Sequence, residues 1–237
     1  MELIYAQDNL NLGQMAARWV ARELLICPDL VLGLPTGSTP IGMYQSLTRL
    51  CQEGIISFTK ARTFNLDEYV GLAADHPQSY AFYMREHFWS KVDLQVENED
   101  IPRGDVANLD EECQRYDAAI QKAGGIGVQI LGLGPNGHIG FNEPSNNMEI
   151  HTHVVNLSTE TIQANTRFFS DSAAVPRQAV TMGVGSIMQA QKILLLVSGE
   201  SKKDILTKSF YGPVSTAVPS SILQLHTDLT VITDIKL

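Results

Sequence analysis

The chain has 237 residues, of which 44% are hydrophobic and 18% are charged, as expected for a globular protein with a full core. Its formal net charge of −9 at pH 7 argues against nucleic acid and acidic membrane surfaces as partners, because both repel an acidic protein. Three distant cysteines without a Cys-x-x-Cys pair, no basic and apolar leader, and no long apolar run predict a cytoplasmic protein without a membrane segment.

Strand and helix patterns alternate along the whole chain. Short apolar runs predict strands at residues 3–6, 30–34, 61–66, 128–133, 179–182, 192–197 and 229–233. Apolar residues at helical spacing predict helices at 12–24, after residue 40, at 79–89, 109–123 and 158–165, and after residues 183 and 202. Asn9 or Asn11 is expected to cap the first helix, and the polar segment 93–105 is expected to be irregular. This alternation predicts a single α/β domain, 1–237, with a doubly wound, mostly parallel, Rossmann-like sheet and helices on both faces.

A polar loop with a glycine follows the second predicted strand. The loop at 35–40 reads Pro-Thr-Gly-Ser-Thr-Pro. Gly37 allows a ligand to approach the backbone, and Thr36, Ser38 and Thr39 offer hydroxyl groups. The free N–H groups at the start of the next helix would attract an anion, although a plain turn with a capping hydroxyl could have the same sequence. Because the Gly-Lys-Ser/Thr of a nucleotide triphosphate site is absent, a small phosphorylated metabolite is the favoured ligand.

Two adjacent carboxylates follow the third predicted strand. Asp67 and Glu68 come directly after the apolar run 61–66. Active sites of open α/β sheets collect at the carboxyl ends of strands, which favours one of the two as a general base in the same cleft as the loop 35–40. The alternative is a pair of solvated charges in a connecting loop.

The segment after the fourth predicted strand is rich in turn-forming and proton-exchanging residues. It reads Gly-Leu-Gly-Pro-Asn-Gly-His-Ile-Gly-Phe-Asn-Glu-Pro at 132–144, and its glycines and prolines prevent a helix. His138 and Glu143 can exchange protons, and Asn136 lies close to them in sequence. Their place at the end of a strand predicts a catalytic site.

Two other interpretations of this region are less favoured. The spacing at 132–137 matches a Gly-x-Gly-x-x-Gly dinucleotide fingerprint, but that fingerprint needs a helix at its third glycine, which 139–144 cannot form. His151 and His153 would share one face of a strand as a metal pair, but no third ligand is near, so surface histidines are favoured. We therefore expect no metal site and no nicotinamide or flavin cofactor.

Six stretches, in family order over nearly the whole chain, resemble the glucosamine-6-phosphate deaminase family. They are Leu34-Pro-Thr-Gly-Ser-Thr-Pro40, Asn65-Leu-Asp-Glu-Tyr69, the motif at 132–144, Asn165-Thr-Arg-Phe-Phe169, Thr181-Met-Gly-Val-Gly185 and Ser198-Gly-Glu-Ser-Lys202. The related 6-phosphogluconolactonases share the fold and a similar glycine–histidine turn, but Thr-Ala-Ser-Leu-Phe-Pro is expected there after the histidine. This chain has Ile-Gly-Phe-Asn-Glu-Pro at 139–144, which is the deaminase form.

The resemblance implies conversion of glucosamine 6-phosphate and water to fructose 6-phosphate and ammonia, without a metal or organic cofactor. It implies that Asp67 moves a proton from C2 to C1 of the sugar. His138 would open the pyranose ring, oriented by Glu143 and Asn136. The residues implied for binding the phosphate are Thr36, Gly37, Ser38, Thr39, Arg167 and Lys202.

The chain resembles the short, non-allosteric members of the family. The allosteric hexamers have Asp where this chain has Asn136, and they bind N-acetylglucosamine 6-phosphate between subunits on basic residues soon after the Glu-Pro of the motif. Residues 145–156 contain no Lys or Arg, and the chain ends at Leu237 without the C-terminal extension that reaches that site. We therefore expect a monomer or small homo-oligomer whose partner is a sugar phosphate.

Two alternatives to a deaminase follow from the same resemblance. One is a hydrolase like 6-phosphogluconolactonase. The other is a non-catalytic effector domain that binds a sugar phosphate. Such a domain normally adjoins a helix-turn-helix, for which no residues remain here, and it needs no base, whereas Asp67, His138 and Glu143 are all present.

Overall fold

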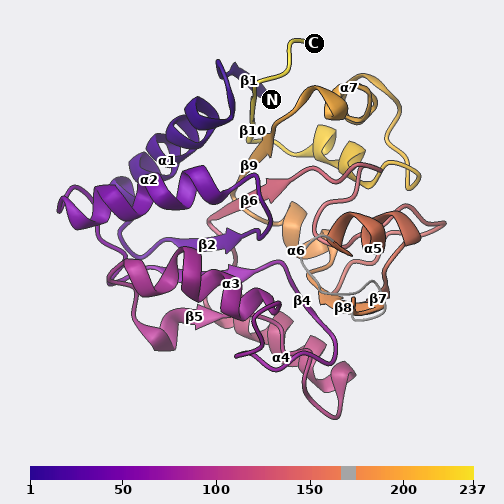
Figure 1. Ribbon diagram of the computed structural model, residues 1–237, viewed down its shortest axis with the longest axis horizontal. Coiled ribbons are helices and arrows are strands. Elements are labelled where there is room, and N and C mark those ends of the chain that lie inside the picture. The colour runs from indigo at the N-terminus through magenta and orange to yellow at the C-terminus, as the bar shows by residue number, and fades with distance from the viewer. Residues whose placement is uncertain (167–174) are drawn as a thin grey trace.

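The computed structural model describes residues 1–166 and 175–237, and within them seven parallel strands form a central sheet (Figure 1). Their spatial order is β1 (Glu2–Tyr5), β10 (Leu229–Thr233), β9 (Lys192–Val197), β6 (Val128–Gly132), β2 (Val31–Leu34), β3 (Arg62–Asn65) and β5 (Glu99–Asp100). Every neighbouring pair is parallel. Most of these strands are nearly continuous apolar runs, because a parallel sheet is buried on both faces.

Helices cover both faces of this sheet. Along β9, Leu194 and Leu196 enter one core while Leu195 and Val197 enter the other, because neighbouring side chains of a strand point to opposite faces. The first core lies under α1 (Asn9–Ile26), α2 (Ile41–Gln52) and α3 (Tyr80–His87), and the second under α4 (Leu109–Lys122), α6 (Val184–Met188) and α7 (Lys203–Tyr211). The predicted doubly wound, mostly parallel α/β fold is confirmed.

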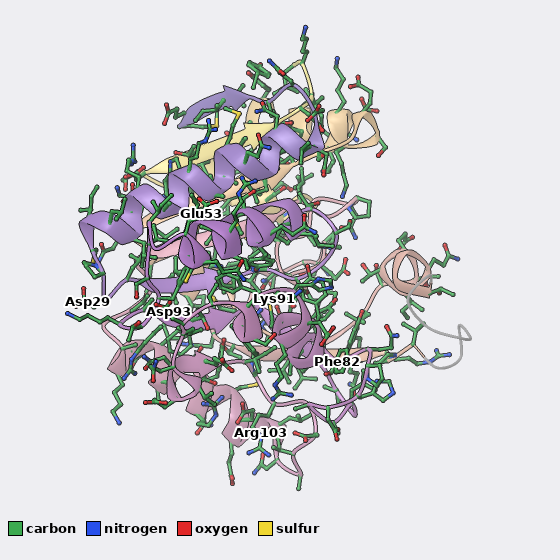
Figure 2. The ribbon with its side chains drawn as sticks, turned by 60° about the vertical axis from the view of Figure 1, so that its left-hand side comes forward. Asp29, Glu53, Phe82, Lys91, Asp93 and Arg103 are labelled. Carbon is green, nitrogen blue, oxygen red and sulfur yellow. The ribbon has the colours of Figure 1, made fainter. Side chains whose placement is uncertain are left out.

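The helices α1 and α2 lie side by side as one layer (Figure 1 and Figure 2). A Cβ atom added at Gly13 would lie 2.6 Å from the carbonyl carbon of Gly42, so this close helix contact requires the glycine. The predicted cap of α1 was wrong. Asp8, and neither Asn9 nor Asn11, caps the helix by accepting a hydrogen bond from the N–H of Asn11 at 2.7 Å, because the helix begins earlier than its apolar pattern.

A second, three-stranded sheet adjoins the carboxyl end of β3 and was not predicted. Within the described residues it consists of β4 (Asp67–Tyr69), β8 (Gln178–Thr181) and β7 (His153–Asn156), with antiparallel pairs on both sides of β8. The sequence pattern assigned 67–69 to a connecting loop. A three-residue strand has no detectable periodicity of its own, and it forms here because β8, distant in sequence, supplies the hydrogen-bonding partners.

The segment 93–105 is less irregular than expected. It contains the edge strand β5, whose two residues pair with β3, and a short 3₁₀ turn at Val96–Asn98. The carboxylate of Asp93, labelled in Figure 2, accepts hydrogen bonds from the hydroxyls of Ser57 and Thr59 and from the N–H of Phe58. Side-chain hydrogen bonds therefore stabilise this connection where strand pairing is minimal.

The described residues contain a few further helical segments. They are α5 (Thr159–Thr166) and the 3₁₀ turns Trp89–Lys91, Glu200–Lys202 and Pro219–Leu225. Among the described residues, no helix combines the length and the apolar character needed to cross a lipid bilayer.

Candidate active site

The loops after β2, β3, β6 and β9 enclose a cavity of about 200 Å³ at the carboxyl ends of these strands. The chain runs from β2 to β3 on one side and returns to β6 on the other. The cavity therefore lies at the topological switch point, where open α/β sheets bind ligands. Seven of the residues predicted for the site line it: Thr36, Gly37, Ser38, Thr39, Asp67, His138 and Lys202.

The loop 35–40 forms one wall of the cavity and is braced from behind by two tyrosines. The hydroxyl of Tyr44 donates to the carbonyl of Pro35 and that of Tyr83 to the carbonyl of Gly37, both at 2.6 Å. Gly37 has a φ of 94°, which favours glycine and turns the loop toward the N-terminus of α2. The first N–H groups of a helix have no partner within the helix, so a rigid loop and a helix end together form a suitable anion site.

Lys202 reaches this cavity from the opposite wall. It lies at the end of the 3₁₀ turn after β9, and its ammonium donates to the carbonyl of Leu133 at the end of β6. That contact holds the positive charge at the rim of the cavity. The second predicted cation, Arg167, lies outside the described residues.

Asp67 is the buried acid of the site, with only 6% of its surface exposed. It pairs with Thr181 across the second sheet, and a Cβ added at Gly140 would lie 3.5 Å from its Oδ2 atom. Burial, together with the negative charge of Glu68, raises the pKa of Asp67 to about 8. A carboxyl group with such a pKa is suited to accepting and returning a proton near neutral pH.

Glu68 faces away from the cavity and stabilises the fold. Its carboxylate accepts hydrogen bonds from the N–H groups of Tyr69, Tyr80 and Ala81 at 2.8–2.9 Å. Two of these donors belong to the first turn of α3, so the carboxylate lies at the positive end of that helix. Burial outweighs these hydrogen bonds and raises the pKa of Glu68 to about 7. Of the two adjacent carboxylates, only Asp67 lines the cavity within the described residues.

Replacing Glu68 by Ala is expected to lower the free energy of unfolding by about 2–4 kcal/mol, because it leaves three N–H donors, two of them buried, without their acceptor. The measurement is urea denaturation at neutral pH. Glu86→Ala removes an exposed carboxylate from the same helix and serves as the control, with an expected change below about 0.5 kcal/mol. Equal effects of the two substitutions would contradict the capping role of Glu68.

His138 lies between a glycine and a carboxylate. A Cβ at Gly134 would lie 2.2 Å from the imidazole Cδ2 atom, so the ring rests against a backbone that must lack a side chain. On its other side, Nδ1 of His138 is 3.5 Å from Oε2 of Glu143, which is an ion-pair distance without the geometry of a hydrogen bond. The carboxylate therefore orients the ring and favours a proton on Nδ1.

Asn136 acts on His138 less directly than predicted. Its amide nitrogen donates to Oε2 of Glu143 at 2.6 Å, and its amide oxygen accepts from the backbone N–H of His138 at 3.2 Å. Burial opposes ionisation of Glu143, but its contacts with His138, Thr161 and Asn136 outweigh burial and lower its pKa to about 2. The glutamate is therefore a permanent negative charge beside the imidazole, and neither Asn136 nor Glu143 lines the cavity itself.

Two groups at the cavity were not identified from sequence. Tyr80 packs against Tyr69 and Phe141, with ring centroids 4.7 and 6.0 Å away, and Tyr80 and Phe141 line the cavity together with Asp67. Thr161, in the first turn of α5, also lines the cavity and donates a hydrogen bond to Glu143. Aromatic residues after a strand and a threonine near a helix start are too common for sequence alone to single them out.

The two histidines considered as a metal pair have other contacts. Nδ1 of His151 is 3.3 Å from the carboxylate of Asp117, and Nδ1 of His153 contacts the carbonyl of His151. Within residues 1–166 and 175–237, no group of three or more His, Cys, Asp or Glu side chains has a geometry that could hold a metal ion.

The sequence of the chain matches a known protein family. The family model for glucosamine-6-phosphate isomerases and 6-phosphogluconolactonases matches residues 11–232. The chain belongs to this family. Its match over nearly the whole chain confirms the resemblance found in the six sequence stretches.

Individual relatives of the family are similar over almost their full length. The chain is 48% identical over 234 residues to a glucosamine-6-phosphate deaminase of Thermoanaerobacter pseudethanolicus, covering 99% of this chain and 92% of the relative. It is 49% identical over 232 residues to one of Lachnoclostridium phytofermentans, covering 98% of both chains.

One solved structure supports the same family membership, and a more distant one shows the same fold. A protein described as a monomeric glucosamine-6-phosphate deaminase superimposes with a TM-score of 0.96 at 44% identity, covering 98% of this chain and 97% of that one. A 6-phosphogluconolactonase of Thermotoga maritima shares the fold at a TM-score of 0.77, with 20% identity and 98% coverage of both chains.

Proposed function

We propose that the chain is a glucosamine-6-phosphate deaminase, which converts glucosamine 6-phosphate and water to fructose 6-phosphate and ammonia by an isomerisation followed by hydrolysis of an imine. The whole of residues 1–237 would act as one catalytic domain in the cytoplasm. The observation that supports this most directly is the cavity in which a buried acid, Asp67, and an imidazole, His138, face a loop suited to a phosphate. Identities of 44–49% to proteins named as this deaminase support the substrate.

The first step is opening of the pyranose ring. It requires a proton for the ring oxygen and removal of the proton on the anomeric hydroxyl. His138 lines the cavity and is held by a carboxylate that remains ionised, so its ring can carry a proton between these two oxygens. The product of this step is the open-chain aldehyde with its amino group still at C2.

Asp67 then moves the carbon-bound proton. It removes the proton from C2 while the protonated amino group gives a proton to the oxygen at C1, which yields an enolamine with a C1–C2 double bond. It then returns its proton to C1, which gives the protonated imine at C2. Addition of water to C2 and loss of ammonia leave the ketone of fructose 6-phosphate. In the bound state, the protonated amino group beside Asp67 would favour the ionised carboxylate and so prepare the base.

The phosphate holds the sugar in register with these groups. The loop residues Thr36, Gly37, Ser38 and Thr39 provide N–H and hydroxyl donors, while Lys202 and Arg167 provide positive charge. Fixing the phosphate places C2 at Asp67 and C1 toward His138, which makes the reaction effectively intramolecular.

The direct test of this function measures ammonia released from glucosamine 6-phosphate by the purified protein. Hydrolysis of 6-phosphogluconolactone is measured in parallel, because lactonases share the fold. We expect ammonia and fructose 6-phosphate in equal amounts and no lactone hydrolysis above background. Lactone hydrolysis without ammonia release would instead favour the lactonase.

Removing one of the two basic side chains proposed to bind the phosphate is expected to weaken binding of the substrate. Lys202→Ala or Arg167→Ala should cost about 1.5–3 kcal/mol, the usual contribution of a hydrogen bond to a charged group, and unphosphorylated glucosamine should be a very poor substrate. The dissociation constant of glucosamine 6-phosphate is measured by titration. Lys203→Ala is the matched control, because this neighbouring lysine forms a 3.6 Å ion pair with Glu200 and does not line the cavity within the described residues. Equal turnover of glucosamine and its phosphate would refute the phosphate site.

We also expect a monomer or small homo-oligomer with hyperbolic kinetics and no activation by N-acetylglucosamine 6-phosphate. Residues 145–156 contain no Lys or Arg to bind a second anion, and an effector acts only through different affinities for two states. A similar protein is described as monomeric. Substrate saturation curves with and without the effector, with light scattering for mass, test this expectation. A sigmoidal curve that becomes hyperbolic with the effector would contradict it.

A further inference from the structure

A chain of hydroxyl groups links the start of α5 to the carboxylate beside His138. The hydroxyl of Ser158 donates to Oγ1 of Thr161 at 3.1 Å and accepts from the N–H of Thr161 at 3.2 Å. The hydroxyl of Thr161 in turn donates to Oε1 of Glu143. The second carboxylate oxygen, Oε2, accepts from Asn136 and faces His138.

This arrangement restrains both oxygens of Glu143 from opposite sides. The side chain of Glu143 is 9% exposed and Thr161 is 2% exposed, so solvent is poorly placed to replace a lost donor. Without the hydroxyl of Thr161, Oε1 would have to find another donor by rotation of the carboxylate. Such a rotation would also move Oε2 away from Nδ1 of His138.

We propose that Thr161 is a positioning residue for ring opening, because its hydroxyl holds the Glu143 carboxylate in the orientation that aligns His138. The inference rests on the proposed deaminase function. Thr161 lines the cavity, but its single hydroxyl proton is donated to Glu143. It therefore acts through the carboxylate and not by donating to the substrate.

The test compares three single substitutions in the full chain. Thr161→Val keeps the shape and removes the hydroxyl, and it should lower kcat for glucosamine 6-phosphate about 10- to 100-fold, as for loss of one hydrogen bond to a charged group. Thr161→Ser retains the hydroxyl and should restore kcat to within about threefold of the wild type. Thr166→Val is the control, because within the described residues its hydroxyl donates to the carbonyl of Ile162 in the same helix and does not contact Glu143.

Binding of an open-chain analogue separates positioning from substrate contact. The analogue 2-amino-2-deoxyglucitol 6-phosphate needs no ring opening, so Thr161→Val should leave its dissociation constant within about twofold of the wild type. An equal loss of analogue binding and turnover would overturn the proposal, because it would mean that Thr161 binds the substrate or that its loss disrupts the cavity.

A double-mutant cycle tests whether the effect passes through Glu143. In a Glu143→Gln background, adding Thr161→Val should change kcat by less than about twofold, because the partner of the hydroxyl is already altered. Additive effects of the two substitutions would overturn the proposal.

A spectroscopic measurement tests the same contact without turnover. The ¹⁵N chemical shifts of the His138 imidazole report which ring nitrogen holds the proton. They should change in Thr161→Val and stay unchanged in Thr166→Val and Thr161→Ser. Unchanged shifts in Thr161→Val would overturn the positioning role. Failure of the wild type to release ammonia would instead overturn the proposed function. The chemical shifts would still test the contact in that case, because they need no turnover.

Discussion

Asp67→Asn is expected to lower kcat for ammonia release by about 10²- to 10⁴-fold, the usual contribution of a positioned general base. Asparagine keeps the shape of the side chain, so the substrate should still bind. Exchange of the C2 hydrogen with solvent, followed by NMR in deuterated water, measures the missing step directly. Near-native exchange in the variant would assign the base to another group, and Glu68 is a poor candidate because three backbone N–H groups occupy it.

The raised pKa of Asp67 predicts the pH dependence of the wild type. The ionised form is the base, so kcat/KM, which reports the free enzyme, should rise with pH up to about 8. The rise of kcat with pH should have its midpoint at a lower pH than the rise of kcat/KM, because the protonated amino group of the bound substrate favours the ionised carboxylate. Steady-state kinetics between pH 5 and 9 separates the two curves.

The Asp67→Asn substitution should raise the free energy of unfolding at neutral pH. Folded Asp67 has a pKa of about 8 and the unfolded residue one near 3.8, so between these values the folded state binds a proton that the unfolded state lacks. The free energy of unfolding of the wild type therefore falls as pH rises through this window. Asp67→Asn removes that loss, and its melting temperature should rise by about 2–4 °C for each kcal/mol recovered. Calorimetry below the unfolded pKa is the control, because the advantage of the variant should disappear there.

The second large effect is expected for His138→Gln. Turnover of the cyclic sugar should fall about 10²- to 10⁴-fold, because the proton shuttle for ring opening is lost. Binding of 2-amino-2-deoxyglucitol 6-phosphate should stay close to that of the wild type, because this ligand has no ring to open. Isothermal titration of the analogue beside steady-state kinetics gives both quantities.

One contradicting outcome and one control complete the His138→Gln experiment. Large and equal losses of turnover and analogue binding would mean that His138 is structural or binds the sugar generally. His226→Gln is the control. This buried histidine contacts the carbonyl of Ala190 and is not among the residues that line the cavity. The control should affect stability and leave the ratio of turnover to binding unchanged.

Much of the fold was predictable because its strands are buried on both faces and appear as uninterrupted apolar runs. The run 192–197 predicted β9 and the run 229–233 predicted β10 with the bounds that the structure has. The periodic segments predicted the helices between them. The second sheet was missed because its three-residue strand β4 depends on β8, which is distant in sequence.

The site was predictable for a related reason. Loops rich in glycine and hydroxyl groups followed four predicted strands, and parallel strands bring their carboxyl ends to one edge of the sheet. The chain pattern alone therefore predicts that Asp67 and His138 lie near the loop 35–40, and the family resemblance adds Lys202; all three line the cavity. Their roles in the reaction remain proposals that the substitutions above test.

By itself, the sequence determined the order of strands and helices, the family and the side chains with suitable chemistry, because these depend on local patterns. The local pattern left Asp67 and Glu68 open and the family resemblance favoured Asp67, but only the tertiary structure shows why Asp67 faces the cavity. The reason is the pairing of β4 with β8 and the cap of α3. The tertiary structure also decided the raised pKa of Asp67 and the contact of Thr161 with Glu143. Burial and hydrogen bonds between distant segments have no signature in the local sequence, because they arise when the packed chain excludes water.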